Sequence, residues 1–166
     1  MKKQFLIILL IVITSQFAFG QTDEVTQIYF IRHAEKVKDG SSDPILTDKG
    51  EKRAIHWSEV FKFEGFDAIY STQTKRTIAT AAVTAKQADL EIIYYNAKTV
   101  DIIALANKHK GQKILIVGHS NTTPYLVNTL IGEDRFEEID SSNNSNLYIV
   151  NYSSLQSSFS LLFIDF

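Results

Sequence analysis

The chain has 166 residues, of which 45% are hydrophobic and 22% are charged, and its formal net charge is -2. This length and composition suit one folded domain and exclude a disordered or collagen-like chain. The slightly acidic balance argues against a general nucleic-acid binder, whose surface has to be basic. The sequence has no cysteine, which excludes disulfides, iron–sulfur clusters, cysteine-ligated zinc and a cysteine nucleophile.

Residues 1–20 have the pattern of a secretory signal peptide. Two lysines precede an unbroken apolar run over residues 5–13, and Ala18 and Gly20 place small residues two apart. We therefore expect cleavage after Gly20, which leaves residues 21–166 as one domain that is exported to the periplasm or secreted. The apolar run is about half of the ~20 residues that a membrane-spanning helix needs, so no stable membrane anchor is expected.

Apolar runs alternate with amphipathic stretches along the rest of the chain, which is typical of α/β proteins. The predicted strands cover residues 27–31, 66–70, 91–95 and 113–117, and the predicted helices cover residues 47–61, 74–88, 98–109 and 123–131. Thr47 is the predicted N-cap of the first helix, and Gly132 ends the last one. Two further runs, 147–152 and 159–166, flank a serine-rich turn and are predicted to form a hairpin.

Histidine and arginine side chains gather where the predicted strands end. They are Arg32 and His33 after the first strand, Arg76 after the second, and His119 with Ser120 after the fourth. Ligands of open α/β sheets bind beyond the carboxyl ends of the strands, so these side chains are expected to form one site. Arginine forks match phosphate oxygens, and an imidazole can attack phosphorus and carry the phosphoryl group. The pattern therefore predicts phosphoryl transfer, assisted by backbone N–H groups where the helix after His119 begins.

Four short motifs carry a resemblance to a known family. They are Arg32-His33-Ala34-Glu35, Leu46-Thr47-x-x-Gly50, Ser71-x-x-x-x-Arg76-x-x-x-Thr80-Ala81 and Gly118-His119-Ser120-Asn121. With these motifs in this order, the chain resembles the histidine phosphatase superfamily from about Ile28 to Gly132. The resemblance implies the phosphoglycerate-mutase-like fold, which is a three-layer α/β/α sandwich with a mostly parallel central sheet.

The resemblance also implies roles for individual residues. His33 would be the nucleophile that becomes phosphorylated, Arg32 and Arg76 would hold the phosphoryl oxygens, and His119 would support the transition state. Ser120 would bind the substrate together with Arg32, Arg76 and His119. The expected reaction is hydrolysis of a phosphomonoester, phosphohistidine or phosphoanhydride in a small molecule or a phosphoprotein. No cofactor or metal is expected, because arginine and histidine already supply the positive charge. The oligomeric state is not predicted.

The chain departs from the family pattern at three places. Ala34 stands where the family usually has glycine, and Asp39 aligns with an asparagine that contacts phosphate in many members. Many members also have a glutamate after the third strand that protonates the leaving group, whereas this chain has Tyr94-Tyr95-Asn96. Glu35, Asp39 and Asp101 are alternative candidates for this general acid. For Glu35, a salt bridge with a nearby lysine or arginine is expected ahead of a role as an acid.

Two other functions stay open at this stage. A pseudophosphatase would keep the anion pocket but would hydrolyse nothing, because its general acid is missing. A serine hydrolase that uses Ser120 is the more remote alternative. Gly118-His119-Ser120-Asn121-Thr122 matches only half of the nucleophile elbow, and no histidine follows His119 to act as the base.

Two further groups of titratable residues are expected on the surface of the protein. The acidic residues Glu133, Asp134, Glu137 and Glu138 have the pattern of a solvated surface. The two remaining histidines, His56 and His109, fall within predicted helices and are expected on the helix surfaces.

Overall fold

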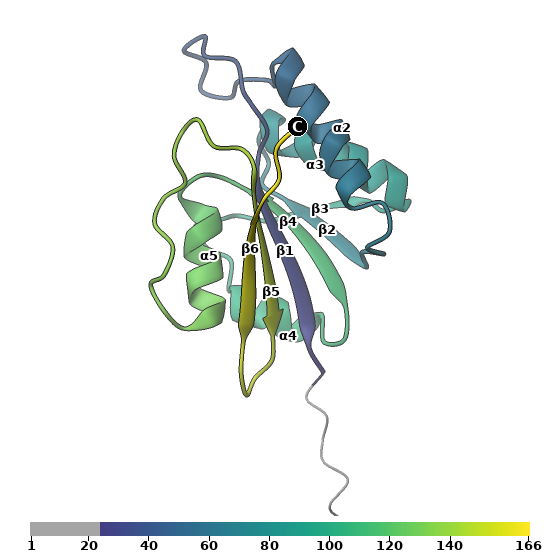
Figure 1. The fold of residues 1–166 in the computed structure, drawn as a ribbon, viewed down its shortest axis with the longest axis vertical. Helices are drawn as coiled ribbons and strands as arrows, with labels where there is room; N and C mark the ends of the chain where they lie inside the picture. The colour runs from purple at the N-terminus through teal and green to yellow at the C-terminus, as the bar shows by residue number, and fades with distance from the viewer. Residues whose placement is uncertain (1–23) are drawn as a thin grey trace, which may run out of the picture.

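The computed structural model describes residues 24–166, so the predicted signal peptide over residues 1–20 lies outside the described residues. The strands are β1 (Thr26–Arg32), β2 (Ala68–Ser71), β3 (Ile92–Tyr94), β4 (Lys113–Gly118), β5 (Asn146–Tyr152) and β6 (Ser158–Phe163). They form a six-stranded sheet in the order β3-β2-β4-β1-β5-β6 (Figure 1). The first four strands of this order run parallel to one another, and β5 and β6 run antiparallel to their neighbours. The mostly parallel sheet is therefore confirmed.

Helices cover both faces of this sheet (Figure 1). They are α2 (Asp48–Val60), α3 (Lys75–Ala88), α4 (Ile102–Lys108) and α5 (Thr122–Ile131). Tyr29 and Ile31 of β1 belong to one core cluster with residues of α2 and α3. Ile28 and Phe30 belong to another with residues of α4 and α5. Because successive strand residues point to opposite faces, this alternation confirms the three-layer sandwich. No helix within residues 24–166 is long and apolar enough to cross a lipid bilayer.

Local capping explains where the helices begin and end. The Thr47 hydroxyl accepts a hydrogen bond from the Gly50 N–H at 3.1 Å, which confirms the predicted N-cap of α2. The predicted helix over residues 98–109 begins only at Ile102, because the Asp101 carboxylate accepts from the Ala104 N–H and caps it there. Gly132 ends α5 with a φ of 73°, the left-handed conformation that glycine adopts without strain.

The C-terminal hairpin pairs β5 with β1 and leaves β6 at the edge of the sheet. After β6 the chain leaves the sheet and packs on α2, where the Phe166 ring stacks on His56. His109 is buried, contrary to the expectation of a surface position. Its ring nitrogens hydrogen-bond the Tyr70 hydroxyl at 2.8 Å and the Gln112 side chain at 2.6 Å.

Candidate active site

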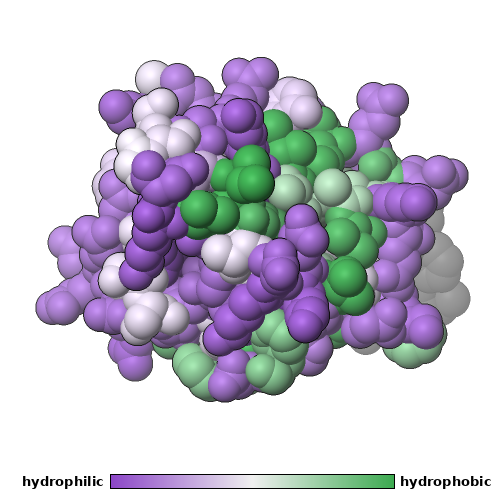
Figure 2. Space-filling model, turned by 90° about the horizontal axis from the view of Figure 1, so that it is seen from above, coloured by the Kyte–Doolittle hydropathy of each residue, from purple (hydrophilic) through white to green (hydrophobic). Residues whose placement is uncertain are grey.

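The predicted site residues meet at the carboxyl ends of the parallel strands. Arg32 pairs in register with Gly118, and Ser71 pairs with Val117, so β1, β2 and β4 end at the same edge. An open cavity of about 740 Å³ lies there, and its wall includes the predicted residues Arg32, His33, Arg76, His119 and Ser120. Figure 2 views this end of the molecule, whose surface is mainly hydrophilic with a smaller hydrophobic region.

His33 is held rigidly in the turn that follows β1. Its backbone N–H donates to the Gly118 carbonyl at 3.0 Å, and its own carbonyl accepts from the Asn144 side chain at 2.8 Å. The ring Nδ1 lies 2.8 Å from the Ala34 carbonyl oxygen. Because a carbonyl can only accept, we assign the ring proton to Nδ1. The other ring nitrogen, Nε2, then keeps a free lone pair, as a nucleophile must.

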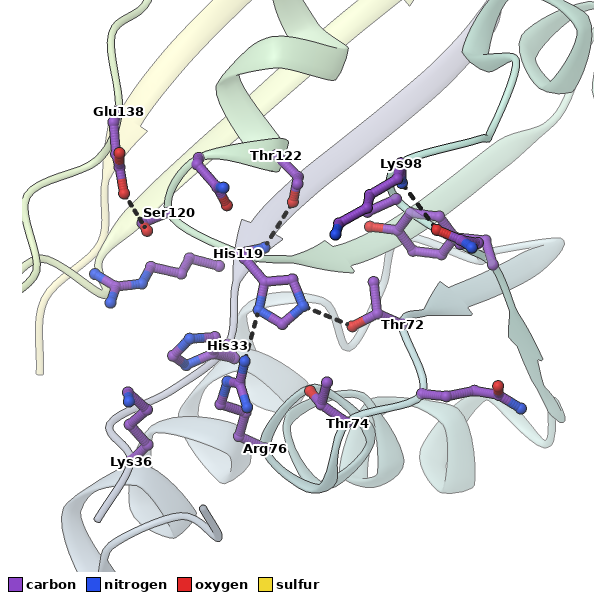
Figure 3. A pocket seen from close by; sticks show the side chains of 16 residues that line it. His33, Lys36, Thr72, Thr74, Arg76, Lys98, His119, Ser120, Thr122 and Glu138 are labelled. Carbon is purple, nitrogen blue, oxygen red and sulfur yellow. Dashed lines mark hydrogen bonds between the residues drawn. The ribbon is translucent and has the colours of Figure 1, made fainter. Parts of the chain in front are cut away.

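The second histidine of the cavity has the opposite tautomer. His119 Nδ1 lies 3.3 Å from a terminal nitrogen of Arg76, and its Nε2 lies 2.9 Å from the Thr72 hydroxyl (Figure 3). Because arginine can only donate, Nδ1 accepts and Nε2 carries the proton that it donates to Thr72. The His33 and His119 rings stand edge to face with their centroids 5.5 Å apart.

Both histidines are neutral at neutral pH. Burial, reinforced by the positive charges of Arg32 and Arg76, lowers the pKa of His33 to about 3 and outweighs the opposing hydrogen bond to Ala34. Burial and the same two arginines also lower the pKa of His119 to about 4. His33 therefore needs no separate base to free its lone pair for attack.

The two arginines keep unsatisfied donors inside the molecule. Arg32 donates from one terminal nitrogen to the carbonyls of Asp140 and Asn143 at 2.8 and 2.9 Å. Arg76 lies 3.5 Å from the Asp43 carboxylate. The Nε atoms of both arginines are buried and have no hydrogen-bond partner among the described residues. A buried N–H without an acceptor is costly, and a bound oxyanion could supply one.

Positive charge dominates the wall of the cavity. The described residues that line it include four basic side chains, Arg32, Lys36, Arg76 and Lys98, and one carboxylate, that of Glu138. Such a field attracts anions and repels cations. Within residues 24–166, no three histidine, aspartate or glutamate side chains come together closely enough to hold a metal ion.

None of the three predicted general acids lines this cavity. The Glu35 carboxylate binds Arg53 through contacts of 3.0 to 3.1 Å and lies 3.4 Å from Lys49. Burial alone would raise the pKa of Glu35, but the hydrogen bonds from Arg53 outweigh it and hold that pKa below its usual value. Asp39 lies in an exposed loop, and Asp101 caps α4. Glu35 is therefore a salt-bridge partner of Arg53 and Lys49. These contacts do not fit the role of a proton donor.

The structure adds residues that the sequence patterns did not identify. Thr72 binds His119, and Asp43 reaches Arg76 from the loop before α2. Glu138 was expected on a solvated surface, yet it lines the cavity and accepts a 2.8 Å hydrogen bond from the Ser120 hydroxyl. Ser120 thus hydrogen-bonds to a carboxylate. A serine hydrolase would instead require a histidine base at this hydroxyl.

Comparisons with known proteins agree with this architecture. The chain superposes on a phosphoserine phosphatase from Entamoeba histolytica with a TM-score of 0.66 at 16% identity, covering 82% of this chain and 96% of that chain. The protein histidine phosphatase SixA complexed with tungstate gives a TM-score of 0.67 at 17% identity, covering 82% and 96%. A phosphoglycerate mutase from Bacillus anthracis gives 0.63 at 17% identity, covering 86% and 95%. No curated protein sequence matches.

Part of the sequence also matches a family model. The model of the Histidine phosphatase superfamily (branch 1) matches residues 28–97, which include Arg32, His33 and Arg76. Residues 28–97 of the chain are therefore similar in sequence to the histidine phosphatase superfamily. This similarity supports a phosphatase or mutase activity. The family match ends at residue 97 and does not include His119. The position of the His119 ring beside the His33 ring is therefore known from the fold and not from the family match.

Proposed function

We propose that the protein is a phosphatase that hydrolyses phosphomonoesters, phosphohistidine or phosphoanhydrides through a phosphohistidine on His33. The observation that carries this proposal is the neutral His33 ring in a cationic cavity, with its proton on Nδ1 and its Nε2 free. The similarity of residues 28–97 to the histidine phosphatase superfamily supports the same reaction class.

The proposed reaction has two steps. In the first, His33 Nε2 attacks phosphorus, the bond to the leaving oxygen breaks, and the phosphoryl group stays on the ring. Arg32 and Arg76 hold the phosphoryl oxygens as charge moves, and His119 lies beside them, oriented by its hydrogen bonds with Arg76 and Thr72. In the second step, water attacks the same phosphorus and releases phosphate and neutral His33.

We propose small phosphorylated molecules or phosphoproteins as substrates, because the cavity is open and its wall is rich in cations. Nucleic acid is not proposed, in keeping with the net charge of -2. No metal and no cofactor enter this scheme, because the arginines supply the charge that a metal would provide. Hydrolysis should therefore persist in a chelator, and activity that is lost there and restored by zinc or magnesium would contradict the scheme.

Trapping the intermediate tests the role of His33. A phosphoramidate is stable in base and labile in acid, so alkaline quenching should retain the label from a phosphorylated substrate and acid quenching should lose it. Mass spectrometry should place the label on the peptide that contains His33. His33→Ala should remove the label and lower turnover by at least ~10³. Near-normal turnover in this variant, or label on Ser120, would refute the mechanism.

A pseudophosphatase is the second candidate, because none of the sequence-predicted acids lines the cavity. Such a protein would bind phosphate but would not hydrolyse it. Release of nitrophenol from p-nitrophenyl phosphate separates the two functions, because this leaving group needs little help from an acid. Turnover that depends on His33 would establish the enzyme, and binding without turnover would establish the pseudophosphatase.

We also propose that the protein is exported and cleaved after Gly20, which the pattern of residues 1–20 supports. N-terminal sequencing of the exported protein should find Gln21 first. A protein that keeps Met1 and stays bound to the membrane would contradict this proposal.

A further inference from the structure

The cavity has one carboxylate whose role the reaction scheme leaves open. Among the described residues that line the cavity, only Glu138 has an acidic side chain. It belongs to the segment between α5 and β5, far in sequence from His33 and outside the region matched by the family. Proton transfer to an alkoxide leaving group requires an acid in this space, and Glu138 is the acidic side chain that the structure provides there.

The backbone on the C-terminal side of Glu138 is fixed to the catalytic turns. The Ile139 N–H donates to the Ser120 carbonyl at 2.9 Å, and the Ile139 side chain is buried. The next residue, Asp140, offers its carbonyl to Arg32 at 2.8 Å. Glu138 is therefore held against the turn that carries His119 and against an arginine of the phosphoryl site, although its side chain is exposed.

The side chain of Glu138 is also oriented toward the site. Its Oε1 accepts the hydrogen bond from Ser120, which lies next to His119 (Figure 3). Its other oxygen, Oε2, belongs to the same exposed carboxyl group, which lines the cavity. One oxygen thus fixes the direction of the carboxyl group, and the other is available to exchange a proton with a substrate or a water molecule.

We propose that Glu138 is the general acid and base of this phosphatase, an inference that rests on the proposed function. In the first step the P–O bond breaks, and the leaving oxygen takes the proton of the Glu138 carboxyl group and departs as an alcohol. In the second step the Glu138 carboxylate takes a proton from water while the water oxygen bonds to phosphorus. The N–P bond to His33 then breaks, which restores the protonated Glu138 and neutral His33.

A general acid matters most for poor leaving groups, and this property gives the test. Glu138→Gln keeps the shape and the hydrogen-bond acceptor of the side chain but removes its titratable proton. We expect it to lower kcat/KM for the alkyl ester phosphoserine by ~10² or more, and for p-nitrophenyl phosphate by less than about fivefold. The matched control is Glu137→Gln, an exposed neighbour that does not line the cavity, which should leave both rates unchanged.

The comparison of the two esters also separates catalysis from folding. Loss of structure, or a change in the binding of phosphate, would slow both esters alike, and an equal loss on both would overturn the proposal, as would an unchanged alkyl rate. Glu138→Asp, which retracts the acid by one methylene, should slow phosphoserine hydrolysis less than Glu138→Gln does. If the wild-type enzyme forms no phosphohistidine, the proposed function fails. If it forms one and Glu138→Gln is not selective, only the role of Glu138 fails.

Discussion

Two arginines, the buried Arg53 on α2 and the half-buried Arg76 on α3, have opposite surroundings. Arg53 binds both carboxylate oxygens of Glu35, donates to the Ser145 hydroxyl at 3.0 Å and lies 3.5 Å from Asp165. Arg76 has one carboxylate, that of Asp43, at the long distance of 3.5 Å, and its Nε has no partner among the described residues. The protein satisfies one guanidinium group by itself and leaves the other short of acceptors.

This difference separates a structural cation from one that is ready to bind a ligand. A buried charge is tolerated when its partners and hydrogen bonds are complete, as they are around Arg53. Around Arg76 the charge gathers with Arg32 and two histidines whose pKa values are depressed. Like charges at close range weaken the folded state, and a bound oxyanion would relieve that repulsion. Arg53 should therefore act on stability, and Arg76 should act on activity.

The largest expected change in stability is the loss in Arg53→Ala. This change leaves the Glu35 carboxylate without its main partner and removes the cation that lies 4.6 Å from the Phe166 ring. We expect the free energy of unfolding to fall by about 3 kcal/mol, the lower end for a broken buried pair, because Glu35 keeps partial access to water. Urea unfolding followed by circular dichroism measures it, with the exposed neighbour Lys52→Ala as control. A loss no larger than that of Lys52→Ala would show that the cluster is not structural.

The next effect is the loss of activity in Arg76→Ala. Removing one donor to the phosphoryl oxygens should lower kcat/KM by about 10²–10³, and KM should rise as kcat falls. Stability should stay the same or increase, because a like charge beside Arg32 disappears. Steady-state kinetics and urea unfolding on the same samples check both parts, with Lys75→Ala as the exposed control on the same helix. If Arg76→Ala loses as much stability as Arg53→Ala, both arginines are structural and the proposed difference between them is wrong.

Sequence reasoning predicted the fold well, because local rules determine most of it. The apolar runs of β1 and β4 are buried on both faces, and Thr47 and Gly132 mark helix ends that capping rules anticipate. The start of α4 was predicted four residues too early, because the capping role of Asp101 was not recognised.

The phosphoryl end of the site was also accessible from sequence, because His33 and His119 directly follow β1 and β4, and Arg76 lies in the first turn of the helix after β2. Even the glycine of the fourth motif has a physical reason, since a Cβ at Gly118 would lie 2.7 Å from the Thr123 hydroxyl oxygen. The leaving-group side was not accessible. Glu138 reaches the cavity only because the segment after α5 folds back onto Ser120, and no local pattern specifies that contact.

Oxyanion binding sharpens the contrast between the arginines. Phosphate or tungstate at about 100 times its Kd should stabilise the wild-type protein by ~2.7 kcal/mol, because the ion binds the folded state alone. This corresponds to a rise in Tm of several degrees, on the order of 5–10 °C. Lys75→Ala should show the same rise, whereas Arg76→Ala should show little. Thermal unfolding at fixed pH and ionic strength measures it. An equal rise in both variants would place the anion elsewhere.

The smallest expected effect is a dependence of stability on pH that comes from the cationic side of the comparison. The pKa of His33 is about 3 in the folded protein, against about 6.5 for a free histidine. Between these values the unfolded chain binds a proton that the folded protein does not, so His33 makes the fold less stable as the pH falls below about 6.5. His33→Gln removes this titration. As the pH falls from 7.5 to 5, the free energy of unfolding should therefore decrease less in His33→Gln than in the wild-type protein. The difference should grow by at most ~1.4 kcal/mol per pH unit. Urea unfolding at both values measures the gain, and Lys52→Ala should show none. A constant difference between His33→Gln and the wild-type protein would mean that His33 is not held neutral by its burial and its neighbours.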